Sequence, residues 1–247
     1  MQIMKNIFIT LTFVCLTGNL FAQQFISSGK IEFERKVNLH KLYDYEGTWG
    51  DYIKKNAPQF ITHYFDFIFK GNQSVYKPGR DVSDAKTANW SNFPGNGNTV
   101  YNDYSTDKFL SSKQVFEQLF LIQDSLPKIN WKITADTRKI AGFLCRRAEA
   151  IIMDSVFVVA FYTDEILATG GPESFNGLPG MILGIGIPRM HLTLFATKLE
   201  LTEVKDTDIK VPAKGKKTNV ADLKKTLQSS MKDWGKEASR NIWFLMI

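Results

Sequence analysis

The sequence predicts a mainly β protein of the α+β class, in which a curved antiparallel sheet carries a C-terminal helix packed on it. Short runs of β-prone residues follow one another with no helical pattern between them, and this order favours antiparallel pairing. Apolar residues recur at helical spacing only near the end of the chain. The length and the ordinary apolar content are sufficient for one large β domain.

The start of the chain is typical of a secretory signal peptide. Lys5 precedes an apolar run over residues 7–16, and small and polar residues then lead to Ala22. The run is shorter than the ~20 apolar residues that a membrane-spanning helix needs. The alternative interpretation is an N-terminal core helix. We expect residues 1–22 to be a cleaved leader, residues 23–247 to form a single domain, and the protein to be exported to the periplasm or the cell envelope.

Removal of the leader changes the cysteine count from two to one, because Cys15 lies within it. Cys145 then stands alone, so the mature chain cannot form an intramolecular disulfide. Apolar and polar residues roughly alternate around Cys145, which predicts that the thiol is buried in a strand. The alternative is a reactive thiol, which would need a nearby base and a lowered pKa.

The first strands show alternating patterns. Over residues 30–42 one face of the expected strand carries Ile31, Phe33, Arg35, Val37 and Leu39, and the other face is polar. Alternating phenylalanines over 65–69, the turn residues 71–72 and a short strand over 74–76 predict a β-hairpin. Residues 79–98 are rich in Asp, Asn, Gly and Ser and have no period, so we expect a long surface loop.

Further strands are expected along the rest of the chain. Candidate strands cover 100–104, 108–112, 115–123 and 131–134, with a hairpin over 144–163 that turns at residues 153–154 and a pair over 181–187 and 191–201. The C-terminal helix is predicted from apolar residues spaced by three and four, namely Val220, Leu223, Leu227, Met231 and Trp234. Its apolar face is expected to pack on the sheet.

The most distinctive segment runs from Thr169 to Leu183, and we call it the Gly-Pro loop. Its glycines permit positive φ angles and its prolines fix φ elsewhere, so the sequence specifies a defined structural loop; these residues are Gly170, Gly171, Pro172, Gly177, Pro179 and Gly180. In one interpretation the loop is a turn that sets strand register. In the other it forms the rim of an apolar groove that binds a ligand or a partner.

The binding interpretation names its own residues. The apolar wall would consist of Phe161, Tyr162, Phe175, Leu178, Met181 and Ile182, with Pro179 in the same loop. Glu173 is the acid of the Gly-Pro loop that we single out as a candidate.

Several segments resemble the GLPGLI family, exported proteins of Bacteroidota-type bacteria. The matching segments are Gly177–Ile182, the glycine-proline lead-in over 170–175, Phe161–Ile166, and Trp131 with Ile140–Ala148. Met181, Phe161, Phe143, Arg147 and Leu167 depart from the family pattern, and only Leu167 replaces a proline. The resemblance covers about 131–187 and implies an exported protein. It implies no activity, because the family has no established one.

The order of a tryptophan-bearing strand, a hairpin, the Gly-Pro loop and an apolar strand is also similar to the half-barrels of periplasmic lipoprotein carriers. In those proteins a curved antiparallel sheet wraps helices and shelters an acyl chain. This is an analogy at the level of the fold.

Familiar catalytic and metal-binding patterns are absent from the sequence. His40, His63 and His191 lie far apart with no second ligand at metal spacing, and we expect His40 and His191 to lie in strands. Ser174 lacks the flanking glycines of a nucleophile elbow, and Gly184 and Gly186 lack the third glycine of a dinucleotide loop. We therefore expect no catalytic residue, no metal and no cofactor.

The net charge of +6 comes largely from lysines near the end of the chain, which are interpreted as solvated surface residues. Nucleic acid is not an expected partner of an exported protein. No apolar run after the leader is long enough to span a membrane. We expect a non-enzymatic binding protein for an apolar or acyl small molecule. The alternatives are an accessory protein that docks onto an envelope assembly through the Gly-Pro loop and, third, a hydrolase or metalloenzyme.

Overall fold

A computed structural model describes residues 27–44, 47–81, 90 and 93–247. The predicted leader over 1–22 and most of the predicted loop over 79–98 lie outside the described residues. The described end of that loop, 93–98, does not lie wholly on the surface, because Asn98 is buried with 3% of its area exposed.

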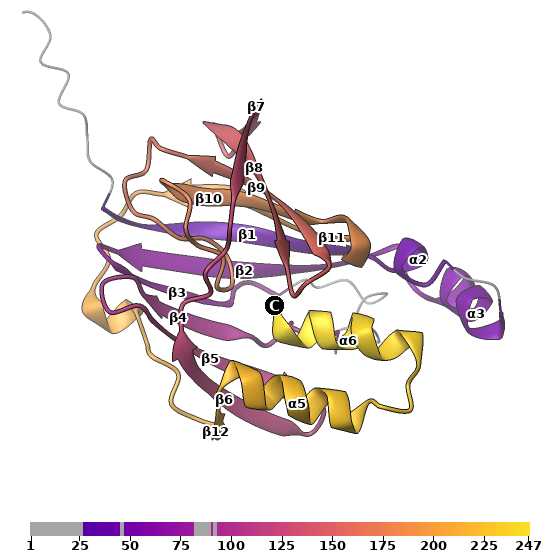
Figure 1. Ribbon diagram of the computed structural model, residues 1–247. Coiled ribbons are helices and arrows are strands. Elements are labelled where there is room, and N and C mark those ends of the chain that lie inside the picture. The colour runs from indigo at the N-terminus through magenta and orange to yellow at the C-terminus, as the bar shows by residue number, and fades with distance from the viewer. Residues whose placement is uncertain (1–26, 45–46, 82–89, 91–92) are drawn as a thin grey trace, which may run out of the picture.

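The structure is mainly β, and its strands form one large, curved, unclosed sheet (Figure 1). The strand order is β12-β6-β5-β4-β3-β2-β1-β11-β10-β9-β8-β7, and every neighbouring pair is antiparallel except β12 with β6. The twelve strands are β1 Ser28–Asn38, β2 Phe60–Lys70, β3 Gln73–Pro78, β4 Thr99–Asp103, β5 Lys108–Val115, β6 Gln118–Ser125, β7 Lys132–Ile140, β8 Phe143–Ile152, β9 Val156–Thr163, β10 Met181–Ile187, β11 Leu192–Glu200 and β12 Lys216–Thr218. The predicted fold class is therefore confirmed.

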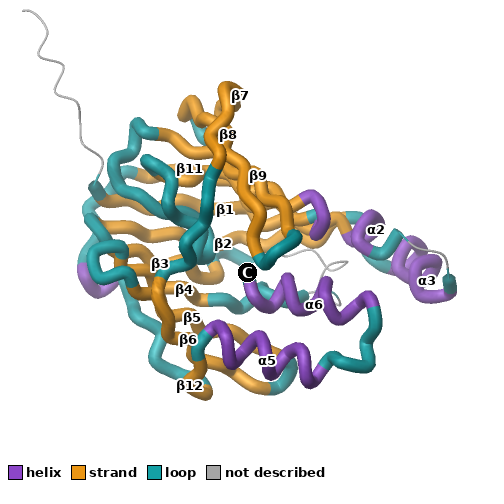
Figure 2. Tube along the Cα trace, viewed as in Figure 1, coloured by secondary structure: helices purple, strands orange, loops and turns teal. Residues whose placement is uncertain are grey.

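The α-helices occupy two places. The last two helices lie side by side across one face of the sheet. A short helical pair projects from the edge of the sheet where β1 ends and β2 begins (Figures 1 and 2). The helical segments are α2 Leu39–Leu42, α3 Thr48–Asn56, η1 Pro188–Met190, η2 Asp206–Asp208, α5 Val220–Ser230 and α6 Lys236–Met246. Helices α5 and α6 thus cover the sheet near β4, β5 and β6.

The C-terminal region contains two helices where the sequence predicts one. Leu223, Leu227 and Met231 are buried against the sheet, as their spacing predicts. The helix ends at Ser230, however, and Trp234 lies beyond it with 46% of its area exposed. Gly235 adopts a φ of 56°, which glycine tolerates readily and which lets the chain reverse into α6.

Strand β1 confirms the predicted alternation. Ile31, Phe33, Arg35 and Val37 all face the core, and the residues between them do not. The predicted strand continues too far, because Leu39–Leu42 is a helix whose first turn is capped by the Asn38 side chain accepting a hydrogen bond from the amide of Lys41. Consequently His40 lies in α2.

Two sharp turns connect strands around β9 and β10. Met153 and Asp154 have φ angles of 47° and 66°, which is the conformation of a two-residue hairpin turn between β8 and β9. This confirms the predicted turn. His191 has a φ of 47° at the end of η1, so it is a turn residue and not the strand residue that we expected.

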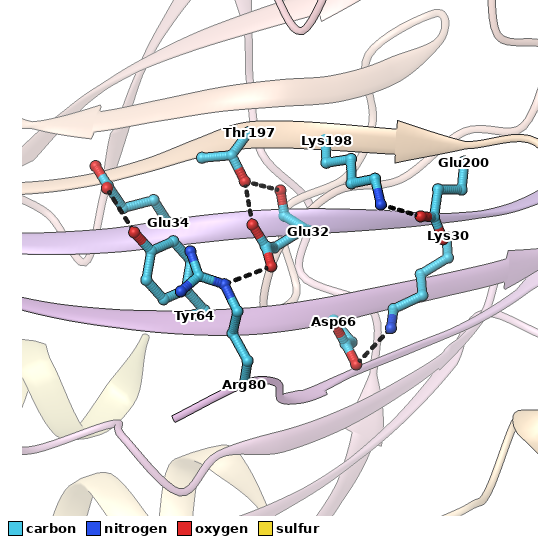
Figure 3. Close-up of polar contacts among 9 residues, drawn as sticks. All are labelled: Lys30, Glu32, Glu34, Tyr64, Asp66, Arg80, Thr197, Lys198 and Glu200. Atoms are coloured by element: carbon cyan, nitrogen blue, oxygen red, sulfur yellow. Dashed lines mark hydrogen bonds and ion pairs between the residues drawn. The ribbon is translucent and has the colours of Figure 1, made fainter. Parts of the chain in front are cut away.

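The opposite face of the sheet is polar and carries a network of ion pairs (Figure 3). Arg80 pairs with Glu32 at 2.9 Å, and Thr197 donates a hydrogen bond to the same carboxylate at 2.6 Å. Lys30 pairs with Asp66 at 3.0 Å. These groups lie at the surface, where the two carboxylates are half-buried and solvent screens the cations, so each pair contributes little to stability. One face of the sheet is therefore polar, and the apolar face is the one covered by α5 and α6.

The Gly-Pro loop returns from β9 to β10 and requires glycine at its end. Gly180 has a φ of 141°, and a Cβ atom there would collide with the carbonyl oxygen of Thr163. Gly186, further along β10, has open space around the corresponding position. The close backbone approach fixes where the loop joins the sheet.

We predict that Gly180→Ala lowers the free energy of unfolding by about 2 kcal/mol or more, because it adds both a collision and an unfavourable φ. Chemical denaturation of the purified variant measures this change. Gly186→Ala is the matched control and should change stability by less than ~0.5 kcal/mol. Equal stability of the two variants would show that the loop does not constrain Gly180 in this way.

Candidate functional site

A cavity of about 370 Å³ lies between the sheet, the two C-terminal helices and the Gly-Pro loop. Its walls come from β4, β5 and β6, from the segment before β7, from the β8–β9 turn, from the loop, and from α5 and α6. The lining residues are Val100, Phe109, Ser111, Lys113, Ile122, Pro127, Lys128, Ile129, Ile151, Ile152, Met153, Asp154, Ser174, Phe175, Val220, Leu223, Met246 and Ile247. Most of these side chains are apolar, which is typical of small-molecule sites.

The exposure of the lining residues shows where the cavity opens. Ile151 is 67% exposed, and Lys128 and Asp154 are also exposed, so these residues form the mouth. Phe109, Ile122 and Leu223 are buried and belong to the interior.

Two polar side chains of β5 reach the interior of the cavity. Ser111 and Lys113 are 0% and 5% exposed and share the inward face of β5 with Phe109 and Val115. The hydroxyl oxygen of Ser111 has no hydrogen-bond partner among the described residues. A buried polar group without a partner costs about 1–3 kcal/mol, so this hydroxyl is an unsatisfied element of the wall.

Lys113 also contacts one residue of the cavity wall and one residue behind it. Its amine donates a hydrogen bond to the main-chain oxygen of Ile247 and lies 3.9 Å from the carboxylate of Glu173. The amide of Asn98 donates to both carboxylate oxygens of Glu173, at 3.1 and 3.2 Å, and to the Ile247 oxygen at 3.3 Å. Glu173, Asn98 and Lys113, which we call the buried polar cluster, thereby connect the Gly-Pro loop to β5 and the end of α6.

Arg35 borders the buried polar cluster from β1. Its guanidinium donates to the carbonyl oxygen of Pro94 at 2.7 Å and to the side chain of Asn96 at 3.2 Å. It also lies over the rings of Phe93 and Phe244, at 5.7 and 6.0 Å from their centres. These contacts hold a buried charge where the predicted alternation of β1 directs it.

Burial controls the ionisation of these groups. It raises the pKa of Glu173 above its ordinary value, although Lys113, Arg35 and the hydrogen bond from Asn98 act in the opposite direction. It lowers the pKa of Lys113, partly offset by the charge of Glu173. Burial also raises the pKa of Tyr76 well above its ordinary value, with the charge of Glu173 acting in the same direction. The site therefore favours the neutral form of each group more than water does.

The backbone of the Gly-Pro loop is held at several points. Glu173 has a φ of 55°, uncommon for a residue with a side chain, and its carbonyl oxygen accepts a hydrogen bond from Asn102 at 3.2 Å. The indole of Trp131 donates to the carbonyl oxygen of Asn176 at 2.8 Å, and the amide of Asn176 donates to that of Pro127 at 3.2 Å. Trp131, part of one family-like segment, thus contacts the Gly-Pro loop of another.

The predicted site residues fall into separate groups in the structure. Phe175 lines the cavity, and Glu173 lies in the buried polar cluster behind it. Core residues that do not line the cavity are Tyr162, Leu178, Met181 and Ile182, with exposed fractions between 0% and 3%. Phe161 is half-buried and lies 6.1 Å from the ring of Phe195, whereas Pro179 is exposed.

The loop residues predicted to be structural make close contacts. A Cβ atom at Gly170 would collide with the side chain of Tyr104. A Cβ atom at Gly171 would approach the side chain of Ile182 to 2.7 Å. Pro172 is buried, and Gly177 is exposed with a φ of 89°.

Sequence reasoning missed Asn98, Ser111 and Lys113. The signal for Ser111 and Lys113 was available, because both occupy alternate positions with Phe109 and Val115 in β5. A serine and a lysine in the apolar phase of a strand indicate a buried polar site. Asn98 has no comparable signal, since it stands at the end of a polar loop segment.

Neither a reactive thiol nor a metal cluster is found in the described part of the chain. Cys145 is buried in β8, as predicted, and burial raises its pKa to about 11, so the thiol stays protonated at neutral pH. No group of three or more His, Cys, Asp or Glu side chains is placed to hold a metal among the described residues. What the arrangement can hold is an apolar group, with hydrogen-bond donors at its inner end.

We predict that Glu173 makes stability depend on pH. Between the ordinary pKa of 4.5 and its raised value, the folded state keeps a proton that the unfolded chain has released, so the contribution of Glu173 to stability falls as pH rises. Thermal unfolding from pH 4 to 7 should show the wild type losing stability relative to Glu173→Gln. If the wild type instead gains stability relative to Glu173→Gln as pH rises, the pKa of Glu173 must be lowered in the folded state, which contradicts the prediction.

A family model described as "Protein of unknown function (Porph_ging)" matches residues 150–184. The match runs from the end of β8 through β9 and the Gly-Pro loop into β10. It includes Glu173 and Phe175. No curated protein matches the sequence. No described helix is long and apolar enough to cross a membrane.

Two solved structures of PNGF-II share the fold. In the C2 crystal form the TM-score is 0.52 at 14% identity, and in the P21 form it is 0.53 at 13% identity. The alignments cover 80% and 81% of this chain but 32% and 33% of the PNGF-II chains, so this chain spans about a third of their length. At these identities the similarity concerns the fold alone.

Proposed function

We propose that this protein is an exported, non-enzymatic binding protein of the cell envelope that holds an apolar small molecule in the cavity beneath the Gly-Pro loop. The observation that carries the proposal is the cavity of about 370 Å³, with mostly apolar walls and a mouth at Ile151, Lys128 and Asp154. Its size falls within the ~300–1,000 Å³ that is usual for ligand sites.

Packing supports a ligand site over a defect in the core. Protein interiors are close-packed, and voids larger than a water molecule are few in each domain. Here the void is bounded by segments distant in the sequence, including β5, the Gly-Pro loop and α6. A space assembled from so many segments and open at one end is expected of a binding site.

Export and family membership form part of the same proposal. The leader-like residues 1–22 and the GLPGLI-like segments around Gly177–Ile182 support a periplasmic or envelope location in a Bacteroidota-type cell.

Docking onto an envelope assembly through the Gly-Pro loop has less support. Gly170, Pro172, Phe175 and Leu178 are buried, and such residues offer little surface to a protein partner. The loop faces inward and is better suited to shape a cavity than to form an interface.

We predict that the neutral fluorescent probe N-phenyl-1-naphthylamine binds in the cavity, with enhanced emission on titration. Val220→Trp places an indole in the cavity wall and should weaken binding about tenfold or more, equivalent to about 1.4 kcal/mol. Val211→Trp adds the same side chain at an exposed position outside the cavity and should leave affinity unchanged.

The two tryptophan variants should unfold at wild-type temperatures, which separates occlusion of the cavity from misfolding. Absence of probe binding to the wild type, or undiminished binding by Val220→Trp, would refute the cavity as a ligand site. Native mass spectrometry of the purified protein should in addition show a co-purified apolar molecule.

A further inference from the structure

We propose that the ligand of this cavity is a single-chain amphiphile with an anionic oxygen head group, which Ser111 and Lys113 bind at the inner end. This inference rests on the proposed function and adds the class of ligand and its orientation. The hydrocarbon chain extends from the head group along the apolar walls toward the mouth at Ile151.

Ser111 supplies the first observation. Its hydroxyl is fully buried, lines the cavity and has no partner among the described residues. A buried hydroxyl without a partner is unfavourable, whereas an oxygen of a bound head group would accept its hydrogen bond. The site is therefore completed by a ligand that brings an acceptor to this point.

Lys113 supplies the second observation, because it places a second donor on the same face of the same strand. An ammonium group has three hydrogens to donate, and the structure pairs it with the Ile247 oxygen and, at 3.9 Å, with Glu173. Hydrogen bonds between an ammonium group and an anionic oxygen are stronger than neutral ones. Ser111 and Lys113 together favour an anionic oxygen over a neutral group.

The remaining walls determine the rest of the ligand. Val100, Phe109, Ile122, Phe175, Leu223 and Met246 surround the interior with apolar side chains. Besides Ser111 and Lys113, the charged or hydroxyl-bearing residues that line the cavity are Ser174 and, at the mouth, Lys128 and Asp154. Such walls suit a hydrocarbon chain. A reversed ligand would place its methyl end against Ser111 and Lys113 and leave the Ser111 hydroxyl without a hydrogen-bond partner.

The test is displacement of N-phenyl-1-naphthylamine by laurate, dodecyl phosphate and 1-dodecanol, which share one chain length and differ in head group. We expect at least one of the two anions to displace the probe at a concentration tenfold or more below that of 1-dodecanol. The two anions distinguish a fatty acid from a phosphate-bearing lipid. Equal or stronger displacement by 1-dodecanol than by both anions overturns the proposal.

Ser111→Ala is the decisive variant, because it removes an unpartnered hydroxyl and should not lower the unfolding temperature of the ligand-free protein. The substitution should lower the affinity for the preferred anion threefold or more and leave the affinity for the probe unchanged. Ser112→Ala, on the same strand with its side chain on the opposite face, is the matched control and should retain anion affinity. Full anion affinity in Ser111→Ala overturns the proposal.

Lys113→Met should abolish the preference for anions over 1-dodecanol, whereas Lys108→Met, at an exposed position of the same strand, should retain it. If Lys113→Met fails to fold, Ser111→Ala still decides the question. A preference that survives in Lys113→Met and is lost in Lys128→Met would place the head group at the mouth and contradict the proposal.

The wild type separates the two proposals. If it does not bind the neutral probe, the proposed function fails. If it binds the probe without preferring anions, this inference alone fails.

Discussion

The contact between Glu173 and its partners is the constraint on which the rest of the site depends. One carboxylate on the Gly-Pro loop accepts hydrogen bonds from Asn98 and lies near Lys113, which in turn donates a hydrogen bond to Ile247, the residue after α6. Four segments of the chain therefore meet at one buried point. Because a buried charge without partners is strongly unfavourable, displacing any one segment would destabilise the other three. The cavity keeps its shape because its walls share this anchor.

Much of the fold follows from local patterns in the sequence. The alternation around Ile31 and Phe33 predicts the buried face of β1, including Arg35, and the turn at Met153 and Asp154 lies where the hairpin pattern predicts it. These predictions succeed because burial has a period of two in a half-buried strand. The same reasoning does not predict helix α3. Its apolar residues Trp49, Tyr52 and Ile53 recur at spacings of three and four, but a helix of 9 residues offers too few repeats to establish a period.

The candidate site is only partly predictable, for a physical reason. Glu173 can be singled out as an acid in a loop of glycines and prolines, but its partners Asn98 and Lys113 lie 75 and 60 positions earlier in the chain. No periodic pattern reports which strands of a curved sheet face the same helix. The predicted apolar wall illustrates the difficulty. Tyr162, Met181 and Ile182 are largely apolar, as Phe175 is, but their side chains are buried in the core and do not line the cavity. Of these residues, Phe175 lines the cavity.

The position of Lys113 links the cavity to the loop. Its amine lies between the cavity and Glu173, so any group that approaches it from the cavity changes the electrostatic environment of that carboxylate. In surroundings of low dielectric such effects are larger than in water. An anion near Lys113 would compete with Glu173 for the same positive charge and favour the protonated carboxyl. A neutral molecule would bring no charge to compete with Glu173. The cluster that holds the Gly-Pro loop in place is thus also the part of the site that is sensitive to the charge of what the cavity contains.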